Sequence, residues 1–283
     1  MSRNTKLDPW VEDLLVDPLN KDPLIFDDSA SVKSSYGRKY EIVDNVLDMR
    51  VHGAMVTGDQ RLWLEGQVHY EQWLKDVGSR NIDQDYAKER ALDQPVYDVL
   101  NVSGRVLDVG GGDGRIRAYV DNDTYVCCDP FLSIPSVNTE NTDLANVYPF
   151  INDPFNFVCC YSEHLPFKSS SFDVVHMRSC IDHFLNPVLA LNEAYRVLSD
   201  NGSIVVGMYV EGGKSGKHGR FKETIKEFLS SIGISRFKDY HVWHPTYSEL
   251  INLIEQSGFS LDKEHWQEGF QDRVVYVQCK KIS

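Results

Sequence analysis

Five short apolar segments, separated by stretches of helical character, follow one another from Gly104 onward and restrict the fold of the chain strongly. They are RVLDV (105–109), TYVCCD (124–129), FNFVCC (155–160), FDVVHMRS (172–179) and SIVVGMYV (203–210). Near-continuous apolar strands joined by helices are typical of a parallel sheet that is covered on both faces. The sequence therefore predicts an α/β fold with a Rossmann-like, mostly parallel sheet and helices on both of its faces.

Boundary signals place two helices and a hairpin after the fourth segment. Asn186-Pro187 is a cap followed by a proline at the first helical position, and we expect that helix to end at the turn Asn201-Gly202. Thr246 and Glu249 form the pattern of a capping box for a helix that stops at Gly258. Two further apolar segments, 259–266 and 273–280, would pair as a C-terminal antiparallel hairpin, which brings the predicted sheet to seven strands.

The character of the chain changes before Gly104. Residues 1–58 are rich in Asp and Pro, and we take them as a small N-terminal appendage. Residues 59–103 are predicted to form a helical cap, in which 60–78 can make a helix bearing Trp63, Tyr70 and Trp73. Residues 104–283 then make up the main domain.

Composition excludes several classes of function. The chain has 29 Lys and Arg against 42 Asp and Glu, and its net charge of −13 would repel a nucleic acid backbone. No segment is long and apolar enough for a membrane span, and the polar start at Met1–Trp10 lacks a signal-peptide core, so we expect a cytoplasmic protein without membrane or nucleic acid partners. The six cysteines contain no C-x-x-C pair and fit reduced core residues.

The stretch VLDVGGGDGR (106–115) is the most informative motif. Glycines directly after a strand allow positive φ angles and let a ligand touch the backbone, and we expect a helix to follow the loop. Arg115 stands where a dinucleotide fingerprint needs its third glycine. The spacing is instead D-x-G-x-G-x-G, formed by Asp108, Gly110, Gly112 and Gly114.

This spacing resembles the first motif of class I S-adenosylmethionine-dependent methyltransferases. The stretches SEHLPFKSSSFDVVHMRSCIDHFLNP (162–187) and EAYRVLSDNG (193–202) resemble the type-11 group, which includes the ubiquinone and menaquinone biosynthetic enzymes. The resemblance covers about residues 100–210 and implies a methyltransferase with S-adenosylmethionine as cofactor and S-adenosylhomocysteine as product.

The resemblance also implies cofactor contacts. Asp108 would favour the ammonium group, directly or through water, while the glycines 110, 112 and 114 let the methionine moiety approach. Asp129 would accept both ribose hydroxyls, with Pro130 and Phe131 beside the adenine. The family often has an acidic residue where Tyr161 stands, and here Ser162 and Glu163 would share its contact with the adenine amino group, unless Glu163 is a solvated loop carboxylate. Arg178, at the carboxyl end of the fourth strand, is the last of the predicted cofactor-binding residues.

The acceptor should lie at the carboxyl ends of the fourth and fifth strands. His183, at a position where the family commonly has histidine, is our candidate general base, with Asp182 to orient it and His244 as a third catalytic candidate. Alternatively, His183 and Asp182 only serve the start of the following helix. His176 lies inside a strand, and we expect it to be a hydrogen-bonded core histidine rather than a site residue. We expect no metal, although Asp182, His183 and His244 together would be suitable ligands.

Other segments carry weaker signals. In HVWHPTYSEL (241–250), we expect pocket residues among His241, Trp243, His244 and Tyr247, or else core aromatics and exposed histidines; Trp266 is a further aromatic candidate. The loop EGGKSGKHGR (211–220) lacks the first glycine of a P-loop and is either a lid over an anionic acceptor or a solvated loop. The appendage faintly resembles a zinc ribbon in which Asp17 and Asn20 replace the cysteines, which predicts a metal-free remnant used for packing or dimerisation.

The sequence thus predicts a methyltransferase that acts on a small-molecule or glycan-intermediate acceptor at oxygen. A nicotinamide-dependent oxidoreductase and a non-catalytic S-adenosylmethionine-binding regulatory protein are the alternatives. The identity of the acceptor and assembly as a homodimer stay open at this stage.

Overall fold

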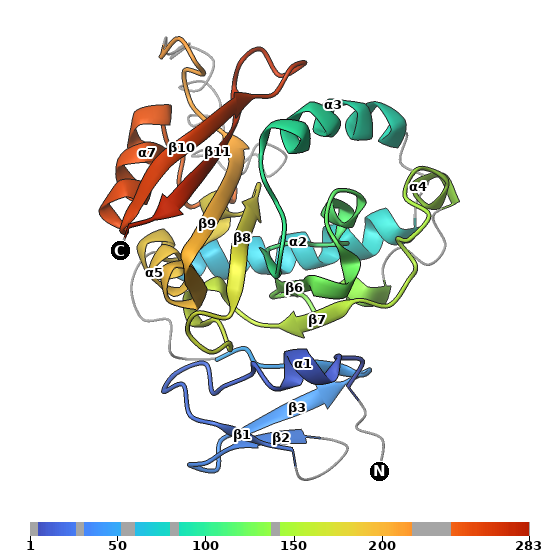
Figure 1. The fold of residues 1–283 in the computed structure, drawn as a ribbon. Coiled ribbons are helices and arrows are strands. Elements are labelled where there is room, and N and C mark those ends of the chain that lie inside the picture. The colour runs from blue at the N-terminus through green and yellow to red at the C-terminus, as the bar shows by residue number, and fades with distance from the viewer. Residues whose placement is uncertain are drawn as a thin grey trace.

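In the part of the chain that the structure describes, eleven strands form one mixed sheet through the centre of the protein (Figure 1). The computed structural model describes residues 5–26, 31–51, 60–79, 85–136, 142–216 and 239–282. The strand order is β1-β2-β3-β4-β7-β6-β5-β8-β9-β11-β10.

Seven of these strands form the predicted Rossmann-like part. They are β5 (Val106–Val109), β6 (Tyr125–Asp129), β7 (Asn156–Cys159), β8 (Phe172–Arg178), β9 (Leu198–Tyr209), β10 (Phe259–Trp266) and β11 (Val274–Lys281). Strands β5 to β9 pair in parallel, and β11 lies antiparallel between β9 and β10. The predicted seven-stranded, mostly parallel sheet with a C-terminal antiparallel hairpin is therefore confirmed.

The N-terminal residues extend this sheet. Strands β1 (Leu24–Ile25), β2 (Ser31–Ser34) and β3 (Lys39–Val43) form an antiparallel ribbon that ends in β4 (Val46–Asp48), and β4 pairs in parallel with β7. The helix α1 (Pro9–Glu12) places Val11 in the main core together with Leu15 and Phe167. The predicted division of the chain at residues 58 and 103 stays a prediction, but the appendage and the main sheet share one ladder of hydrogen bonds.

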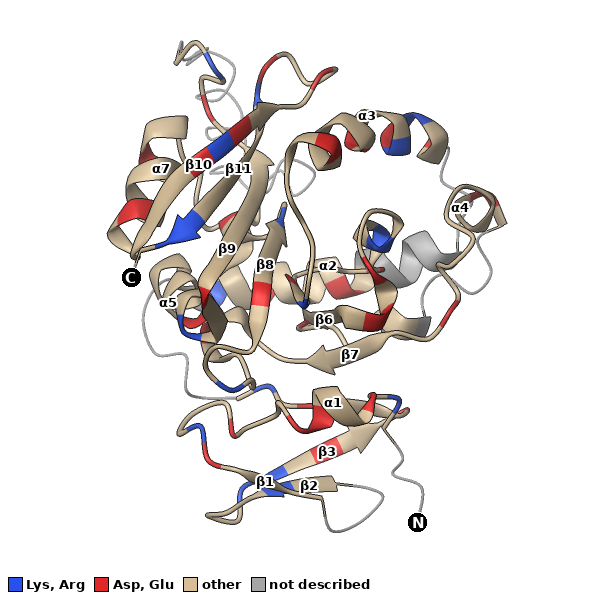
Figure 2. Ribbon diagram, in the orientation of Figure 1, with Lys and Arg blue, Asp and Glu red and all other residues tan. Residues whose placement is uncertain are grey.

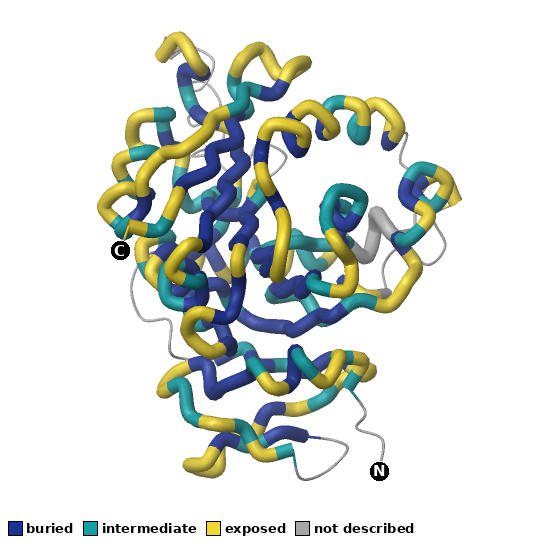
Figure 3. Tube along the Cα trace, in the orientation of Figure 1, coloured by how far each residue is buried: buried dark blue, intermediate teal, exposed yellow. Residues whose placement is uncertain are grey.

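Helices cover both faces of the sheet, as expected. On one face, α5 (Pro187–Val197) and α7 (Tyr247–Gln256) pack Leu191 and Leu250 into the same core as Val175. On the other face, α3 (Tyr86–Val99) packs Val96 and Tyr97 over the sheet. Figure 3 shows the central strands as buried between these layers. The helix α2 (Gln60–Ser79) and the short α4 (Thr142–Val147) complete the described helices.

The predicted caps are confirmed. The Asn186 side chain accepts a hydrogen bond from the backbone N–H of Leu189 and begins α5. Thr246 and Glu249 make the full capping box of α7, which ends at Gln256 just before Gly258, a residue with a φ of 91°. These local signals depend only on neighbouring residues, which is why the sequence located them.

Two helix boundaries were predicted wrongly. The glycine loop leads only into η1, a 3₁₀ turn at Arg115–Ala118, because α3 already covers this face and Tyr97 stacks on Tyr119 with 4.3 Å between ring centroids. The helix α5 ends at Val197 rather than at Asn201-Gly202, because Leu198 takes an extended conformation and pairs with Phe172.

In the N-terminal segment that faintly resembles a zinc ribbon, Asp17 is the centre of a hydrogen-bond network that contains no cysteine. Asp17 is fully buried and accepts hydrogen bonds from the backbone N–H groups of Leu19 and Asn20. The Arg38 guanidinium contacts both carboxylate oxygens at 2.7 and 2.8 Å, and the Tyr40 hydroxyl donates to one of them. Arg38 thus compensates the charge of the buried Asp17, and the metal-free packing role of this segment stays a prediction.

The distribution of charged residues and cysteines over the structure can be compared with the expectations from composition. Helix α3 carries both acidic and basic residues, whereas α1 and α7 carry acidic residues and no Lys or Arg (Figure 2). All six cysteines are buried and free, as expected of reduced core residues. Among the described residues, none of the helices is long and apolar enough to cross a bilayer.

Candidate functional site

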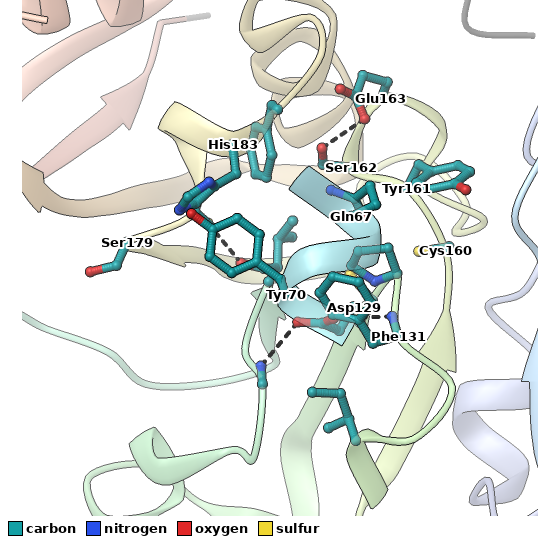
Figure 4. Close-up of a pocket in the computed structure, with 18 of the residues that line it drawn as sticks. Gln67, Tyr70, Asp129, Phe131, Cys160, Tyr161, Ser162, Glu163, Ser179 and His183 are labelled. Atoms are coloured by element: carbon teal, nitrogen blue, oxygen red, sulfur yellow. Dashed lines mark hydrogen bonds between the residues drawn. The ribbon is translucent and has the colours of Figure 1, made fainter. Parts of the chain in front are cut away.

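A cavity of about 400 Å³ lies at the carboxyl ends of β5 to β8, where α2 passes over them (Figure 4). Its volume is in the range of small-molecule sites. Eight of the predicted residues line it, namely Gly110, Gly112, Asp129, Pro130, Phe131, Ser162, Glu163 and His183. The sequence therefore located eight of the nineteen residues that line the cavity, and their roles stay predictions.

The glycine loop leaves its backbone accessible to a ligand. Gly110, Gly112 and Gly114 have φ angles of 66°, 53° and 72°, in the region that favours glycine. A Cβ atom at Gly110 would lie 2.7 Å from Cys180, whereas one at Gly112 would meet no atom within 4 Å. Because Gly112 lines the cavity, a side chain there would occupy the space of a ligand. Gly114 is not among the lining residues and shapes the turn instead.

Asp129 ends β6 at the floor of the cavity and is only 7% exposed. Its carboxylate accepts hydrogen bonds from the backbone N–H groups of Gly112 at 3.3 Å and Phe131 at 3.2 Å (Figure 4). Burial raises the pKa of Asp129 to about 7, against the lowering effect of these two bonds. A ligand that donates hydroxyl hydrogens would favour the ionised form.

Aromatic residues form the wall of the cavity near the ends of β6 and β7 and at α2. Phe131 and Tyr161 line it, and Trp63 of α2 meets Tyr161 edge to face with 5.4 Å between the ring centroids. The Ser162 hydroxyl donates to one oxygen of Glu163, and the N–H of Asn186 donates to the other. Glu163 therefore ties the turn η4 (Ser162–His164) to the start of α5, and its predicted adenine contact stays untested.

Asp108 lies behind the glycine loop, outside the set of lining residues. It is 1% exposed, and its two oxygens contact the Tyr125 hydroxyl and His176 Nδ1, each at 2.8 Å. Nε2 of His176 lies 3.1 Å from the Tyr97 hydroxyl. The closed network that results supports the loop from below. His176 is a hydrogen-bonded core histidine, as predicted from its position inside a strand.

Arg178 is held away from the cavity. Its guanidinium makes a two-pronged ion pair with Asp93 of α3 at 2.6 and 2.7 Å, and it lies over the Tyr276 ring. The expectation that Arg178 takes part in cofactor binding is not supported by this placement. The partner lies 85 residues earlier in the chain, so no local pattern announces the pair.

Candidate catalytic residues cluster at η5 (Ile181–His183), but the histidine that joins Asp182 and His183 differs from the predicted one. Asp182 and His183 lie beside His241, and their ligand atoms are within 4.8 Å of one another. The ring centroids of His183 and His241 are 4.3 Å apart. His244 lies outside this group, with Nε2 at 3.6 Å from Asp239. The sequence combined Asp182 and His183 with His244, and the structure brings His241 to that position.

His183 is the member of this cluster that lines the cavity. Its ring packs edge to face against that of Tyr70, with 4.7 Å between the centroids (Figure 4). Burial lowers its pKa below the usual value, so the ring is neutral at physiological pH. Its Nδ1 atom is buried and has no hydrogen-bond partner within the described parts of the chain.

Sequence reasoning missed the contribution of Gln67. Trp63, Gln67 and Tyr70 all line the cavity, and their spacing of four and three residues places them on one face of α2. That spacing was available in the sequence, but nothing local shows that α2 crosses the ends of the strands. Trp243 and Tyr247 pack against the core instead, and the ring of Tyr247 lies 5.2 Å from that of Trp266.

Comparisons with known proteins agree with this geometry. Residues 107–206 match the model of a methyltransferase domain, Methyltransf_11. The chain is 26% identical over 246 residues to the mitochondrial arginine-hydroxylase NDUFAF5 of Danio rerio, covering 82% of this chain and 67% of the relative. It is 23% identical over 235 residues to the ubiquinone/menaquinone biosynthesis C-methyltransferase UbiE of Ruegeria sp. (strain TM1040), covering 81% and 77%.

Among solved structures, the 1,6-didemethyltoxoflavin-N1-methyltransferase of Burkholderia thailandensis has a TM-score of 0.53 at 15% identity, covering 92% of this chain and 99% of that one. This likeness shows the fold. The match to Methyltransf_11, with the cavity at the strand ends, identifies residues 107–206 as a class I S-adenosylmethionine-dependent methyltransferase domain of type 11. Its cofactor is S-adenosylmethionine. Its location in the cell stays a prediction, since one relative is mitochondrial.

Proposed function

We propose that the protein transfers the methyl group of S-adenosylmethionine to an oxygen of a small-molecule or glycan-intermediate acceptor. The observation that carries this proposal is the neutral, cavity-lining His183 with an unpartnered Nδ1 atom. A hydroxyl group is a poor nucleophile until it loses its proton, whereas many carbon and nitrogen acceptors need no such group.

The proposed arrangement follows the walls of the cavity. The methionine moiety lies along Gly110 and Gly112, the ribose hydroxyls donate to Asp129, and the adenine lies near Phe131 and Tyr161. The sulfonium is then directed toward Cys180 and His183, and the acceptor lies in the cavity beside the paired rings of His183 and Tyr70. In-line displacement at the methyl carbon needs mainly this positioning.

The lone pair of His183 can activate an acceptor hydroxyl in two ways. It can accept the proton, as the sequence predicts, or it can bind a cation that lowers the pKa of the hydroxyl. In both cases an oxygen–carbon bond forms, the carbon–sulfur bond breaks, and S-adenosylhomocysteine leaves as the neutral thioether.

A two-part experiment tests the proposal. Calorimetry should show binding of S-adenosylmethionine in preference to NAD, which separates a methyltransferase from the nicotinamide-dependent alternative. Purified protein is then incubated with methyl-labelled S-adenosylmethionine and a set of hydroxyl, amine and carbon acceptors of similar size. Label that appears only on hydroxyl acceptors supports the proposal. Binding without transfer to any acceptor would favour the regulatory alternative.

The arginine-hydroxylase relative adds one product to look for. Mass spectrometry of the product distinguishes the gain of a methyl group from the gain of an oxygen atom. A product that carries additional oxygen and no label from S-adenosylmethionine would overturn the proposal.

A further inference from the structure

Residues of metal-binding type meet where η5 touches the segment that precedes α7. Asp182, His183 and His241 offer ligand atoms that all lie within 4.8 Å of one another. The backbone N–H groups of Val242 and Trp243 donate to the carbonyl oxygen of Asp182, at 2.8 and 3.3 Å, and hold the two segments together. The cluster is therefore a built feature of the fold and does not result from two independent loops.

The orientation of His241 is fixed by a neighbouring carboxylate. Its Nδ1 atom lies 2.5 Å from Oδ1 of Asp239, and an ionised carboxylate only accepts, so Nδ1 carries a hydrogen. The other nitrogen, Nε2, then lies 3.7 Å from Oδ2 of Asp182. A lone pair and a carboxylate oxygen repel each other, so this approach requires positive charge between them. A proton on Nε2 or a bound cation would supply it.

Two further atoms distinguish these explanations. Oδ1 of Asp182 and Nδ1 of His183 are buried without a hydrogen-bond partner among the residues that the structure describes. Buried polar atoms are normally bonded, and leaving one unpaired costs about 1–3 kcal/mol. A proton on His241 satisfies only the pair formed with Asp182, whereas a cation draws ligand atoms from all three residues.

We propose that Asp182, His183 and His241 bind one divalent transition-metal ion at the acceptor end of the cavity. Two imidazoles and one carboxylate form a recurrent ligand set for such ions and leave coordination positions open. Asp239 is then a positioning residue, since metal-bound histidines usually donate their second ring N–H to a carboxylate.

This proposal rests on the proposed methyl transfer to oxygen. It adds the metal ion as the group that activates the acceptor hydroxyl. A hydroxyl bound to the cation loses its proton to water more easily, because the cation stabilises the oxyanion. The oxyanion then attacks the methyl carbon, and the sulfonium becomes a neutral thioether. The acceptor class becomes narrower: hydroxyl compounds that can reach a metal ion next to His183, with those bearing two adjacent oxygens favoured.

The test uses Co²⁺ as a spectroscopic probe on tag-free, chelator-treated full-length protein. One Co²⁺ per chain should bind with a visible absorption spectrum typical of nitrogen and oxygen ligands. His241→Gln and Asp182→Asn should weaken the affinity at least about tenfold, and Asp239→Asn by about tenfold. His265→Gln is the matched control, because His265 lies on the edge strand β10 and should leave the affinity unchanged.

Two outcomes overturn the proposal: no Co²⁺ binding by the wild-type protein, or binding that the three variants do not weaken. Parallel measurements keep this result separate from the proposed function. If chelator-treated protein binds S-adenosylmethionine and methylates a hydroxyl acceptor at full rate, methyl transfer stands and the metal ion is not its activating group. If the cofactor does not bind at all, the proposed function fails, while the Co²⁺ titration still decides on the site.

Discussion

Two aspartate–histidine clusters in the described part of the chain differ in whether their hydrogen bonds are closed. Asp108 and His176 lie below the loop, and each of their bonding atoms has a partner in Tyr125, Tyr97 or the other member of the pair. Asp182 and His183 lie beside the cavity, and each keeps a buried atom without a partner in the described structure. Identical residue types therefore serve different roles, set by their partners.

The comparison gives a physical criterion for function. A closed buried network stabilises one arrangement, and removing a member leaves the others unpaired at a cost in stability. An open network costs stability as it stands and is expected where a ligand completes it. Asp129 combines both, since two backbone N–H groups hold it and its carboxylate also lines the cavity.

The largest expected effect comes from the open cluster. His183→Ala should lower turnover by about 10²- to 10⁴-fold, because the acceptor hydroxyl loses the group that activates it. The affinity for S-adenosylmethionine should change little, since the cofactor contacts lie elsewhere in the cavity. Steady-state rates together with calorimetry separate the two quantities. Turnover close to that of the wild type would show that positioning alone drives the reaction.

A substitution in the closed cluster of Asp108 and His176 should lower the stability of the folded protein. His176→Ala leaves Asp108 and the Tyr97 hydroxyl without a shared partner in the core, and we expect a loss of about 3–5 kcal/mol in the free energy of unfolding. His241→Gln in the open cluster should change stability by no more than about 1 kcal/mol. Urea denaturation of both variants makes the comparison. Equal losses would contradict the distinction between the clusters.

An intermediate effect is expected at Asp129. In the proposed arrangement Asp129 accepts both ribose hydroxyls, so Asp129→Ala should make the binding free energy of S-adenosylmethionine less favourable by about 1.5–3 kcal/mol. Calorimetry on the folded variant measures this loss, with circular dichroism as the check on folding. An unchanged affinity would remove Asp129 from the cofactor site.

These contrasts also show what the sequence could and could not predict. Strands β5 to β11, the caps of α5 and α7 and the glycine loop follow from neighbouring residues, and they were predicted, whereas β1 to β4 were not. The ion pair of Arg178 with Asp93 and the position of His241 beside Asp182 depend on segments about 60 to 85 residues apart. The 3₁₀ turn after the glycine loop has the same origin, since a helix earlier in the chain covers that face. Open and closed clusters look alike until such distant partners are placed.

The smallest expected effect concerns pH and again uses Asp129. Its pKa in the folded protein is raised to about 7, above its ordinary value, so the folded state holds this proton more tightly than the unfolded state does. Its contribution to stability is therefore present at low pH and is lost as the pH rises from about 4 through about 7. Ribose hydroxyls donate to the ionised form, so cofactor affinity should change in the opposite direction and increase by up to about tenfold between about pH 6 and about pH 8. Calorimetry in two buffers of different ionisation enthalpy should detect the proton released on binding, and Asp129→Asn should abolish both the release and the pH dependence. A release that persists in this variant would assign the titration to another group.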